Sequence, residues 1–421
     1  MTHITKVINK KVLDIQNFHT FANSNQKTNF LAMLNRRILR GKAMQALYGF
    51  RQCKDANFQV AIERIGEKFL PDLNSMEKQD SVQLNADKAA AIALFKSQFA
   101  TNNSIKDLSI TPKIRQATSD SIAFFHKQVK KDYEETKDTM VRYTEKLYDR
   151  YLSLLQLLVE FSDFVDKEFK ERQKRLINPA PVFEHEQKLL INQTINKLRN
   201  HRAFNKEVIN RKLLFDLELV RQWFRILQKD EIYLEYYRLT EVDAEKDYEI
   251  TDYILRNVIL KNDVITSYFN DMDTNWDEDK STVKSMAFKT LKAIQEQGND
   301  AELVQLTPNW DDDRDFYREL FMLAVTNDEE YTQIIADKTQ NWDISRITPV
   351  DTVILKMAIA EMTHFPSIPV KVTINEYIEI CKIYSTPKSK EFINGLLEVI
   401  SKELESQGKV RKSGRGLLDN K

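Results

Sequence analysis

The sequence predicts an all-α fold, and three observations support that class. Gly and Pro number only 8 and 9 among 421 residues, far below average usage, so tight hairpin turns are rare. Apolar residues recur at helical spacing in most segments, as at Leu39, Ala43 and Leu47. Helix-start signals precede several segments, most plainly at Thr348. Hydrophobic residues make up 42% of the chain, which is enough to bury cores and to exclude a disordered protein.

The charges balance over the whole chain but separate along it. Lys plus Arg and Asp plus Glu number 63 each, so net charge alone does not identify a nucleic-acid binder. Two segments are locally basic, from Arg36 to Arg51 and in the tail from Lys409, whereas acidic residues gather at 271–279, 311–315 and 328–330. A local RNA-binding face needs such a separation, although a solvated helix face is the commoner role of a charge run.

Cysteine usage and hydropathy favour a cytoplasmic protein. Cys53 and Cys381 are the only cysteines, so there is no disulfide framework and a reducing compartment is expected. The N-terminus lacks the apolar core of a signal peptide, and the most apolar run, 152–161, is too short to span a bilayer. Cys381 lies on an apolar helical stripe, which favours a buried structural thiol.

The first half of the chain divides into an extension, a short basic helical segment and a long middle. Residues 1–32 are polar without a sustained period, so they are either a disordered extension or lie upstream of a true start at Met33. Residues 33–65 are helical by period, and 66–305 form a helical middle of irregular spacing, which favours a bundle over a solenoid. Helical patterns in the middle cover 86–100, 121–146, 148–176, 184–199, 205–228, 232–240, 248–270 and 277–297, with a helix stop at Asn178-Pro-Ala-Pro181.

Residues 306–405 carry the clearest helix signals and precede a basic tail, 406–421. Thr348-Pro-Val-Asp351 places a hydroxyl at the N-cap, proline at the first helical position and an acid at N3. The helix that follows, to Met362, is apolar on most faces, so we expect it to be the central buried helix. Pro366 and Pro369 should end it.

Two further helices are expected before the tail. Thr373-Ile-Asn-Glu376 has the pattern of a capping box for a helix through Tyr384, and Thr386-Pro387 should open the last helix. Gly395 lies inside an apolar helical pattern, where it would permit a close contact between helices.

Four stretches in this order resemble the NusB family. They are Arg36-Arg37 with Gln45-Ala-Leu-Tyr48, Asp315-Phe-Tyr-Arg-Glu-Leu320, Trp342-Asp-Ile-Ser-Arg-Ile347 with 351–361, and 368–379 with Phe392-Ile-Asn-Gly395. The order of the stretches, in agreement with the helix signals, makes the match specific. On this resemblance 33–65 and 306–405 are two parts of one NusB-like domain, and 66–305 is a helical insertion like that of the enlarged variants of the Bacteroidetes type.

The resemblance implies a non-enzymatic antitermination factor of two packed helical bundles, without a cofactor. It implies binding of boxA-type single-stranded RNA together with NusE, a small-subunit ribosomal protein, at the elongating RNA polymerase, in support of ribosomal RNA transcription. Some relatives form homodimers that hide the RNA face. The family's arginine-rich RNA segment falls on Arg36, Arg37 and Arg40, and its last-helix phenylalanine falls on Phe392.

The residue chemistry agrees with such a face. The candidate RNA-binding residues are Arg36, Arg37, Arg40, Lys42, Tyr48, Lys388, Lys390 and Phe392. Arginine forks suit phosphates and also stack on bases, and an exposed aromatic ring stacking an unpaired base contributes about 1–3 kcal/mol. The competing interpretation places Phe392 and Tyr48 in the core and leaves the arginines as solvated charges.

Catalytic and metal chemistry is not expected. The six histidines show no metal-ligand spacing, there is no glycine-rich phosphate loop, and Asp311-Asp-Asp313 is more typical of a helix start than of a cation site. One alternative function is a helical protein-interaction scaffold with a vestigial RNA face. The other, an accessory domain of an RNA methyltransferase, is disfavoured because no glycine-rich nucleotide-binding segment follows residue 405.

Overall fold

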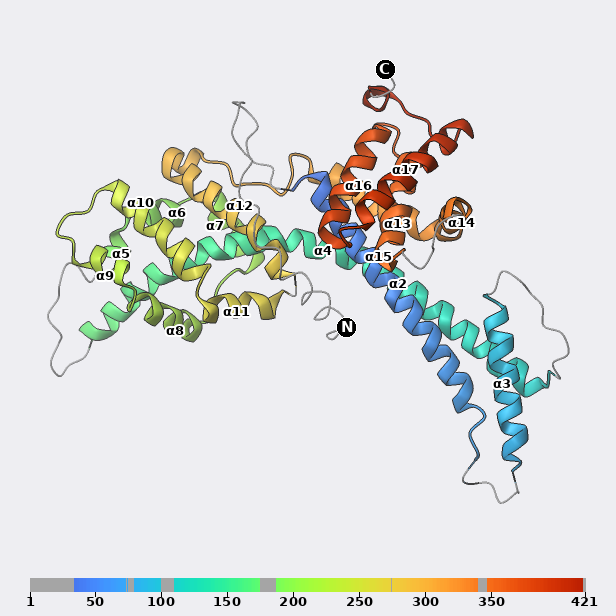
Figure 1. Ribbon diagram of the computed structural model, residues 1–421. Coiled ribbons are helices and arrows are strands. Elements are labelled where there is room, and N and C mark those ends of the chain that lie inside the picture. The colour runs from blue at the N-terminus through green and yellow to red at the C-terminus, as the bar shows by residue number, and fades with distance from the viewer. Residues whose placement is uncertain are drawn as a thin grey trace. The chain divides into compact units, whose positions relative to one another are not determined.

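The computed structural model describes residues 34–72, 74, 79–99, 110–174, 187–273, 275–339 and 347–418. All regular structure in these ranges is helical, with no β-strand, so the predicted all-α class is confirmed (Figure 1). The predicted extension 1–32, the start at Met33, the helix stop at 178–181 and the stretch 342–346 lie outside the described residues.

The chain forms two compact units, each built from two chain segments. Among the described residues, unit 1 combines 34–35 with 143–310, and unit 2 combines 36–142 with 311–418. The boundary between the units falls inside one helix, α4 (Pro112–Gln173). The segment limits expected from the sequence, at 65/66 and 305/306, stay a prediction.

Unit 1 consists of short helices packed with the second half of α4. Its elements after α4 are α5 (Lys188–Ile191), α6 (Gln193–Arg199), α7 (Arg202–Arg211), α8 (Leu217–Leu227), α9 (Glu231–Arg238), α10 (Ala244–Tyr253), the π-helix η2 (Ile254–Ile259), α11 (Asp263–Met272), α12 (Trp276–Gln297) and η3 (Gly298–Asp300). Asp216, Asp230 and Asp243 each accept a hydrogen bond from a first-turn N–H, which explains why helices start at these points. Trp276 stacks on Phe269 in the core, with ring centroids 4.8 Å apart.

Several helix predictions in the middle were wrong. The expected helix 248–270 is interrupted at 260–262, where Asn262 caps α11, and the described part of the expected helix 184–199 is divided at Asn192, which caps α6.

The expected helices 121–146 and 148–176 are one helix, α4, because no glycine or proline interrupts the sequence between them. The expected helix 205–228 is instead two helices. Lys212 adopts a left-handed conformation (φ 55°) after α7, and Asp216 then caps α8.

Unit 2 contains a helical bundle around α15 (Pro349–His364). The bundle also contains α2 (Arg36–Glu67), α13 (Trp310–Thr326), α14 (Asp328–Thr339), α16 (Val370–Tyr384), α17 (Ser389–Ser406) and the 3-10 turn η5 (Gly414–Leu417). Helix α15 packs against α2, α14, α16 and α17, and its residues 353–362 are buried. The prediction of a central buried helix is therefore confirmed, as is its capping box between Thr348 and Asp351.

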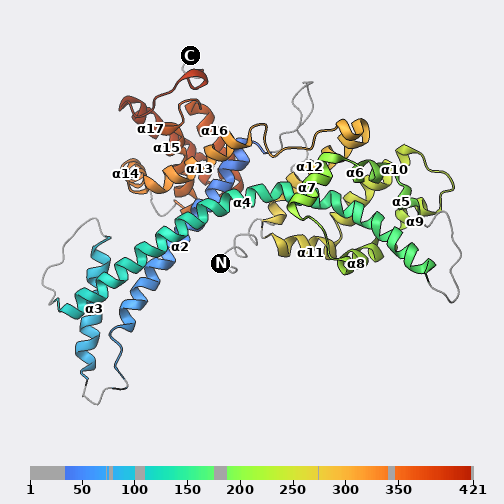
Figure 2. The ribbon, with the colours of Figure 1, turned by 180° about the vertical axis from the view of Figure 1, so that it is seen from behind.

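The other end of α2 belongs to a second structure within unit 2, which we call the helical arm. The arm comprises residues 51–67 of α2, α3 (Ser81–Ser97) and residues 112–142 of α4, which lie side by side in Figures 1 and 2. It has its own apolar core, including Ile65, Phe95 and Phe125. Tyr133 of α4 stacks on Phe321 of α13 with centroids 5.9 Å apart, and both rings contact Phe50. These rings connect the arm to the bundle.

The starts of the last two long helices differ from expectation. Helix α16 begins at Val370, directly after Pro369, so Thr373 lies inside it and the predicted capping box does not form. Helix α17 begins at Ser389, and Thr386 instead precedes it in a turn. Gly395 makes no close helix contact, since a Cβ placed there would meet no atom within 4 Å.

Candidate nucleic-acid interface

A buried ion pair fixes the first turns of α2. Arg40 is 3% exposed, and Glu361 of α15 is completely buried. Nε and Nη2 of Arg40 donate to the two carboxylate oxygens of Glu361 over 2.6 and 2.8 Å, a bidentate arrangement. Burial alone lowers the pKa of Arg40, but the charge of Glu361 and its hydrogen bonds outweigh burial, so the pKa is raised. Arg40 therefore holds α2 on α15.

Helix α16 completes the surroundings of Glu361. The Thr373 hydroxyl donates to Oε1 of Glu361 over 2.9 Å, and the Tyr377 hydroxyl donates to Oε2 over 3.3 Å. Burial, and then the charge of Glu361, raise the pKa of Tyr377 well above its usual value. The network ties α2, α15 and α16 together at one point, and Thr373 serves it instead of capping a helix.

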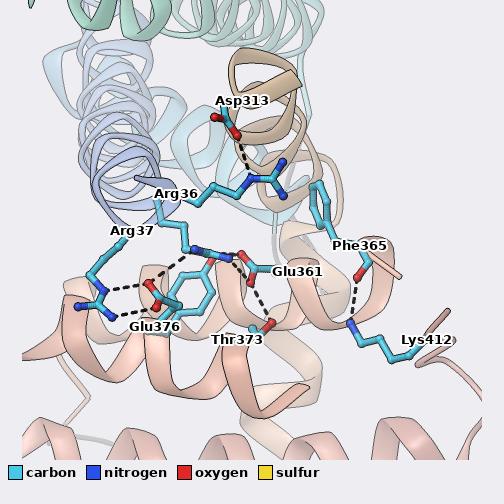
Figure 3. Close-up of polar contacts among 10 residues, drawn as sticks. Arg36, Arg37, Asp313, Glu361, Phe365, Thr373, Glu376 and Lys412 are labelled. Atoms are coloured by element: carbon cyan, nitrogen blue, oxygen red, sulfur yellow. Dashed lines mark hydrogen bonds and ion pairs between the residues drawn. The ribbon is translucent and has the colours of Figure 1, made fainter. Parts of the chain in front are cut away.

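The two preceding arginines reach different carboxylates (Figure 3). Nε and Nη2 of Arg37 donate to Glu376 of α16, both over 2.9 Å, and Nε of Arg36 donates to Asp313 of α13 over 2.9 Å. The hydrogen bonds between Arg37 and Glu376 raise the pKa of the arginine and lower that of the glutamate. The side chains of Arg36 and Arg37 are still 43% and 44% exposed, so each presents an edge to solvent.

The start of α17 is positioned by a buried carboxylate, Asp351. Besides the Thr348 N–H of the capping box, Asp351 accepts hydrogen bonds from the hydroxyls of Ser385 and Ser389. The first turn of α15 therefore fixes the loop that leads into α17. Lys388 and Lys390 flank Ser389 in this fixed segment, and both are exposed.

A contact from α2 holds the end of α16, which leads into the second basic region. Nε2 of Gln45 donates to the hydroxyl of Tyr384 over 3.4 Å, and Tyr384 is the last residue of α16, immediately before the loop. Tyr48 lies three residues after Gln45 on α2 and is half-buried. The end of α16 thus packs against the side of α2 that carries Gln45.

The basic tail also docks on unit 2. Nζ of Lys409 pairs with Glu330 over 2.8 Å, and Nζ of Lys412 donates to the Phe365 carbonyl over 3.1 Å (Figure 3). Burial lowers the pKa of Lys412 to about 8. Gly416 passes so close to the Pro366 carbonyl that a Cβ would stand 2.1 Å from its oxygen, so only glycine fits there.

The eight predicted site residues fall into three environments. Arg36, Arg37, Lys388 and Lys390 are exposed, Tyr48 and Phe392 are half-buried, and Arg40 and Lys42 are buried. The sequence did not predict that Asp313, Asp351, Glu361 and Glu376 organise this surface; Asp351 and Glu376 were expected only in capping boxes, and Asp313 only at a helix start. A signal existed for Glu361, because Lys356 and Glu361 are the only charges in an otherwise apolar helical stretch, and both are ion-paired.

Other kinds of site find no support in the described ranges. No group of three or more His, Cys, Asp or Glu residues is placed there to hold a metal ion. Asp311 and Asp313 lie in the first turn of α13, as the helix-start interpretation predicts. Cys381 is fully buried, and burial raises its thiol pKa to about 11. Across those ranges, no helix has the length and apolar character needed to cross a membrane.

Comparisons with known proteins cover most of the second chain segment of unit 2 and the last part of unit 1, residues 281–310. The model of the NusB family matches residues 281–402. The transcription antitermination protein NusB of Salinibacter ruber is 39% identical over 141 residues, which are 32% of this chain and 88% of the relative. The NusB proteins of Chloroherpeton thalassium and Koribacter versatilis are 41% and 38% identical, over 25% and 23% of this chain and 50% and 66% of their own lengths. No solved structure matches the chain. Since most of the Salinibacter protein aligns at this identity, the chain belongs to the NusB family.

Proposed function

We propose that the protein is a cytoplasmic transcription antitermination factor. In this proposal it binds boxA-type single-stranded RNA together with NusE, the small-subunit ribosomal protein, at the elongating RNA polymerase, and it supports ribosomal RNA transcription. The observation that carries the proposal is the 39% identity across 88% of a relative named as an antitermination protein. The protein acts by binding and not by catalysis.

The exposed cations are the proposed phosphate contacts. Arg36 and Arg37 each keep an exposed edge beside their carboxylate partners, and Lys388 and Lys390 stand in a segment held in place by Asp351. Positively charged groups on a preorganised frame bind phosphates without a large ordering cost. Arg40, with its fork directed at Glu361, positions this surface.

Two half-buried aromatic residues are the proposed base contacts. Tyr48 and Phe392 each retain some exposed surface. Stacking of an unpaired base on such a ring contributes about 1–3 kcal/mol and tolerates different bases. Phe392 follows Lys388 by four residues, one helical turn, so the ring and that cation lie on the same side of the start of α17, where one strand of RNA could use both.

The test is binding of a labelled boxA-like RNA by fluorescence anisotropy, with and without NusE, against a scrambled RNA of equal composition. The Lys388→Glu/Lys390→Glu variant should bind roughly tenfold more weakly, because two phosphate contacts become repulsive. Neither lysine has a carboxylate partner in the described structure, so the fold should be unaffected.

A matched control reverses two exposed lysines elsewhere, Lys229 and Lys402, with the same change in net charge. Selective binding that NusE tightens, and that only the Lys388/Lys390 variant loses, would support the proposal. Equal weak binding of both RNAs by all three proteins would contradict it and favour a protein-interaction scaffold.

A further inference from the structure

The helical arm contains a pocket of about 380 Å³ between α2 and α4. The lining residues are Arg64, Lys68, Asp120, Ser121, Ala123, Phe124 and Lys127. Arg64 lies in the last turn of α2, Lys68 in the turn directly after that helix and Lys127 on α4, and all three are exposed. The pocket therefore gathers positive charge from segments distant in the sequence.

The cations of this pocket are available to a ligand. The Arg64 guanidinium lies over the Phe124 ring, with its carbon 4.4 Å from the ring centroid. Such stacking holds the guanidinium by its face and leaves its N–H groups free to donate. Within the described ranges, no carboxylate pairs with Arg64, Lys68 or Lys127.

The one acidic side chain of the lining does not neutralise these cations. Oδ1 of Asp120 accepts a hydrogen bond from Gln116, one turn earlier on α4, over 2.6 Å. This hydrogen bond leaves the charge of Asp120 in place, and the lining still carries three cations against one carboxylate. The pocket has a surplus of positive charge although the chain as a whole is neutral.

The helices that carry the pocket are packed together by the apolar core of the arm. Ile65, Phe69 and Phe125, which neighbour the lining residues in sequence, belong to the arm's own core. The cations are thus presented by ordered helices, and substitutions at their exposed ends leave that core intact.

We infer that this pocket binds the phosphate backbone of single-stranded RNA, as a second contact beyond the interface on the bundle. The inference rests on the proposed function for the identity of that RNA. Arg37 and Arg64 lie on the same helix, about 40 Å apart at a rise of ~1.5 Å per residue, so a strand leaving the first surface can follow α2 to the second. Unpaired cations beside an aromatic ring match a backbone-tracking surface with a stacking platform better than they match an acidic polypeptide.

The experiment compares two labelled uridine oligomers, of about 8 and about 24 nucleotides, one within and one beyond the ~4–16 nucleotides of a single-strand site. The Arg64→Glu/Lys68→Glu/Lys127→Glu variant of the full chain should bind the long oligomer roughly tenfold more weakly and the short one almost as the wild type does. Its slope of log affinity against log salt should fall by about 2, since each phosphate contact contributes about 0.7 for a single strand.

Two controls separate this inference from a general charge effect and from the proposed function. Lys96→Glu/Arg115→Glu/Lys131→Glu reverses three exposed arm cations outside the pocket, and an equal loss in that variant would overturn the inference. Unchanged binding by the pocket variant, or equal competition by polyglutamate, would overturn it too. Uridine oligomers contain no boxA sequence. This experiment therefore tests the pocket even if the protein shows no selectivity for boxA.

A second substitution, with the opposite expected effect on binding, keeps the inference testable if the triple variant misfolds. Asp120→Asn removes the only carboxylate of the pocket and keeps an acceptor for Gln116. It should tighten binding of the long oligomer a few-fold and leave the short one unchanged. Weaker or equal binding of the long oligomer would contradict the inference.

Discussion

The two ends of α2 both carry cations, but those cations face different surroundings. At the bundle end, Arg36, Arg37 and Arg40 each donate to a carboxylate on α13, α16 or α15. At the arm end, Arg64 and Lys68 line a pocket without a carboxylate partner. The same residue types in one helix therefore serve assembly at one end and remain available for a ligand at the other.

This difference shows that a basic run in a sequence does not measure free positive charge. The partners of Arg36, Arg37 and Arg40 lie 277, 339 and 321 positions away in the chain. Each pair reduces the charge that an RNA could meet, and the buried pair removes Arg40 from solvent. The arm has fewer arginines in a row, yet in the described structure Arg64, Lys68 and Lys127 of its pocket have no carboxylate partner.

The largest effect should come from breaking the buried pair. Glu361→Gln keeps the shape of the side chain but removes the bidentate partner of Arg40, so the buried guanidinium keeps only the carboxylate of Glu376, 3.7 Å from its Nη1. Loss of one partner of a buried pair costs about 3–5 kcal/mol of unfolding free energy. Chemical denaturation of the variant and the wild type, followed by circular dichroism, measures this loss.

The matched substitution at the other end of α2 is Arg64→Gln. Arg64 is exposed and has no carboxylate partner, so its removal loses only the stacking on Phe124 and should lower the unfolding free energy by about 0.5–1 kcal/mol. Similar losses of unfolding free energy from Glu361→Gln and Arg64→Gln would contradict the inferred difference between the two ends of α2.

The sequence predicted the bundle well where the signals are local. Thr348, Pro349 and Asp351 are adjacent in the chain, and they start α15 as expected. Thr373 and Glu376 have the same spacing as a capping box but form none, because Pro369 already starts the helix and both side chains are used in tertiary contacts. Local spacing alone could not separate these two cases.

The candidate site was only partly predictable for the same reason. Exposure of Lys388 and Lys390 follows from the apolar period of α17, which leaves them off the buried stripe. Burial of Arg40 depends on Glu361, whose position relative to α2 is set by the packing of α15. The arm pocket needs α2 and α4 side by side, and no local pattern indicates that pairing.

A second, smaller effect tests whether the arm and the bundle are one body. Tyr133→Ala removes the ring that stacks on Phe321 and contacts Phe50, which should cost about 2 kcal/mol for a half-buried aromatic residue. Hydrogen exchange should then speed up in the arm more than in α15. Tyr133→Phe keeps the ring and should behave like the wild type. Uniform acceleration across unit 2 would contradict a separable arm.

The last effect concerns the C-terminal tail and depends on pH. Burial lowers the pKa of Lys412 from 10.5 to about 8 in the folded protein, so between these values the unfolded chain binds a proton that the folded protein has lost. Stability rises with pH wherever the unfolded state binds more protons, so the contribution of Lys412 should become more favourable from about pH 8 to about pH 10.5. Lys412→Met lacks this titration, and the difference in melting temperature between wild type and variant should shift in favour of the wild type across that window. A difference that stays constant with pH would show that Lys412 keeps its ordinary pKa, and that the tail does not bury its amine at the Phe365 carbonyl.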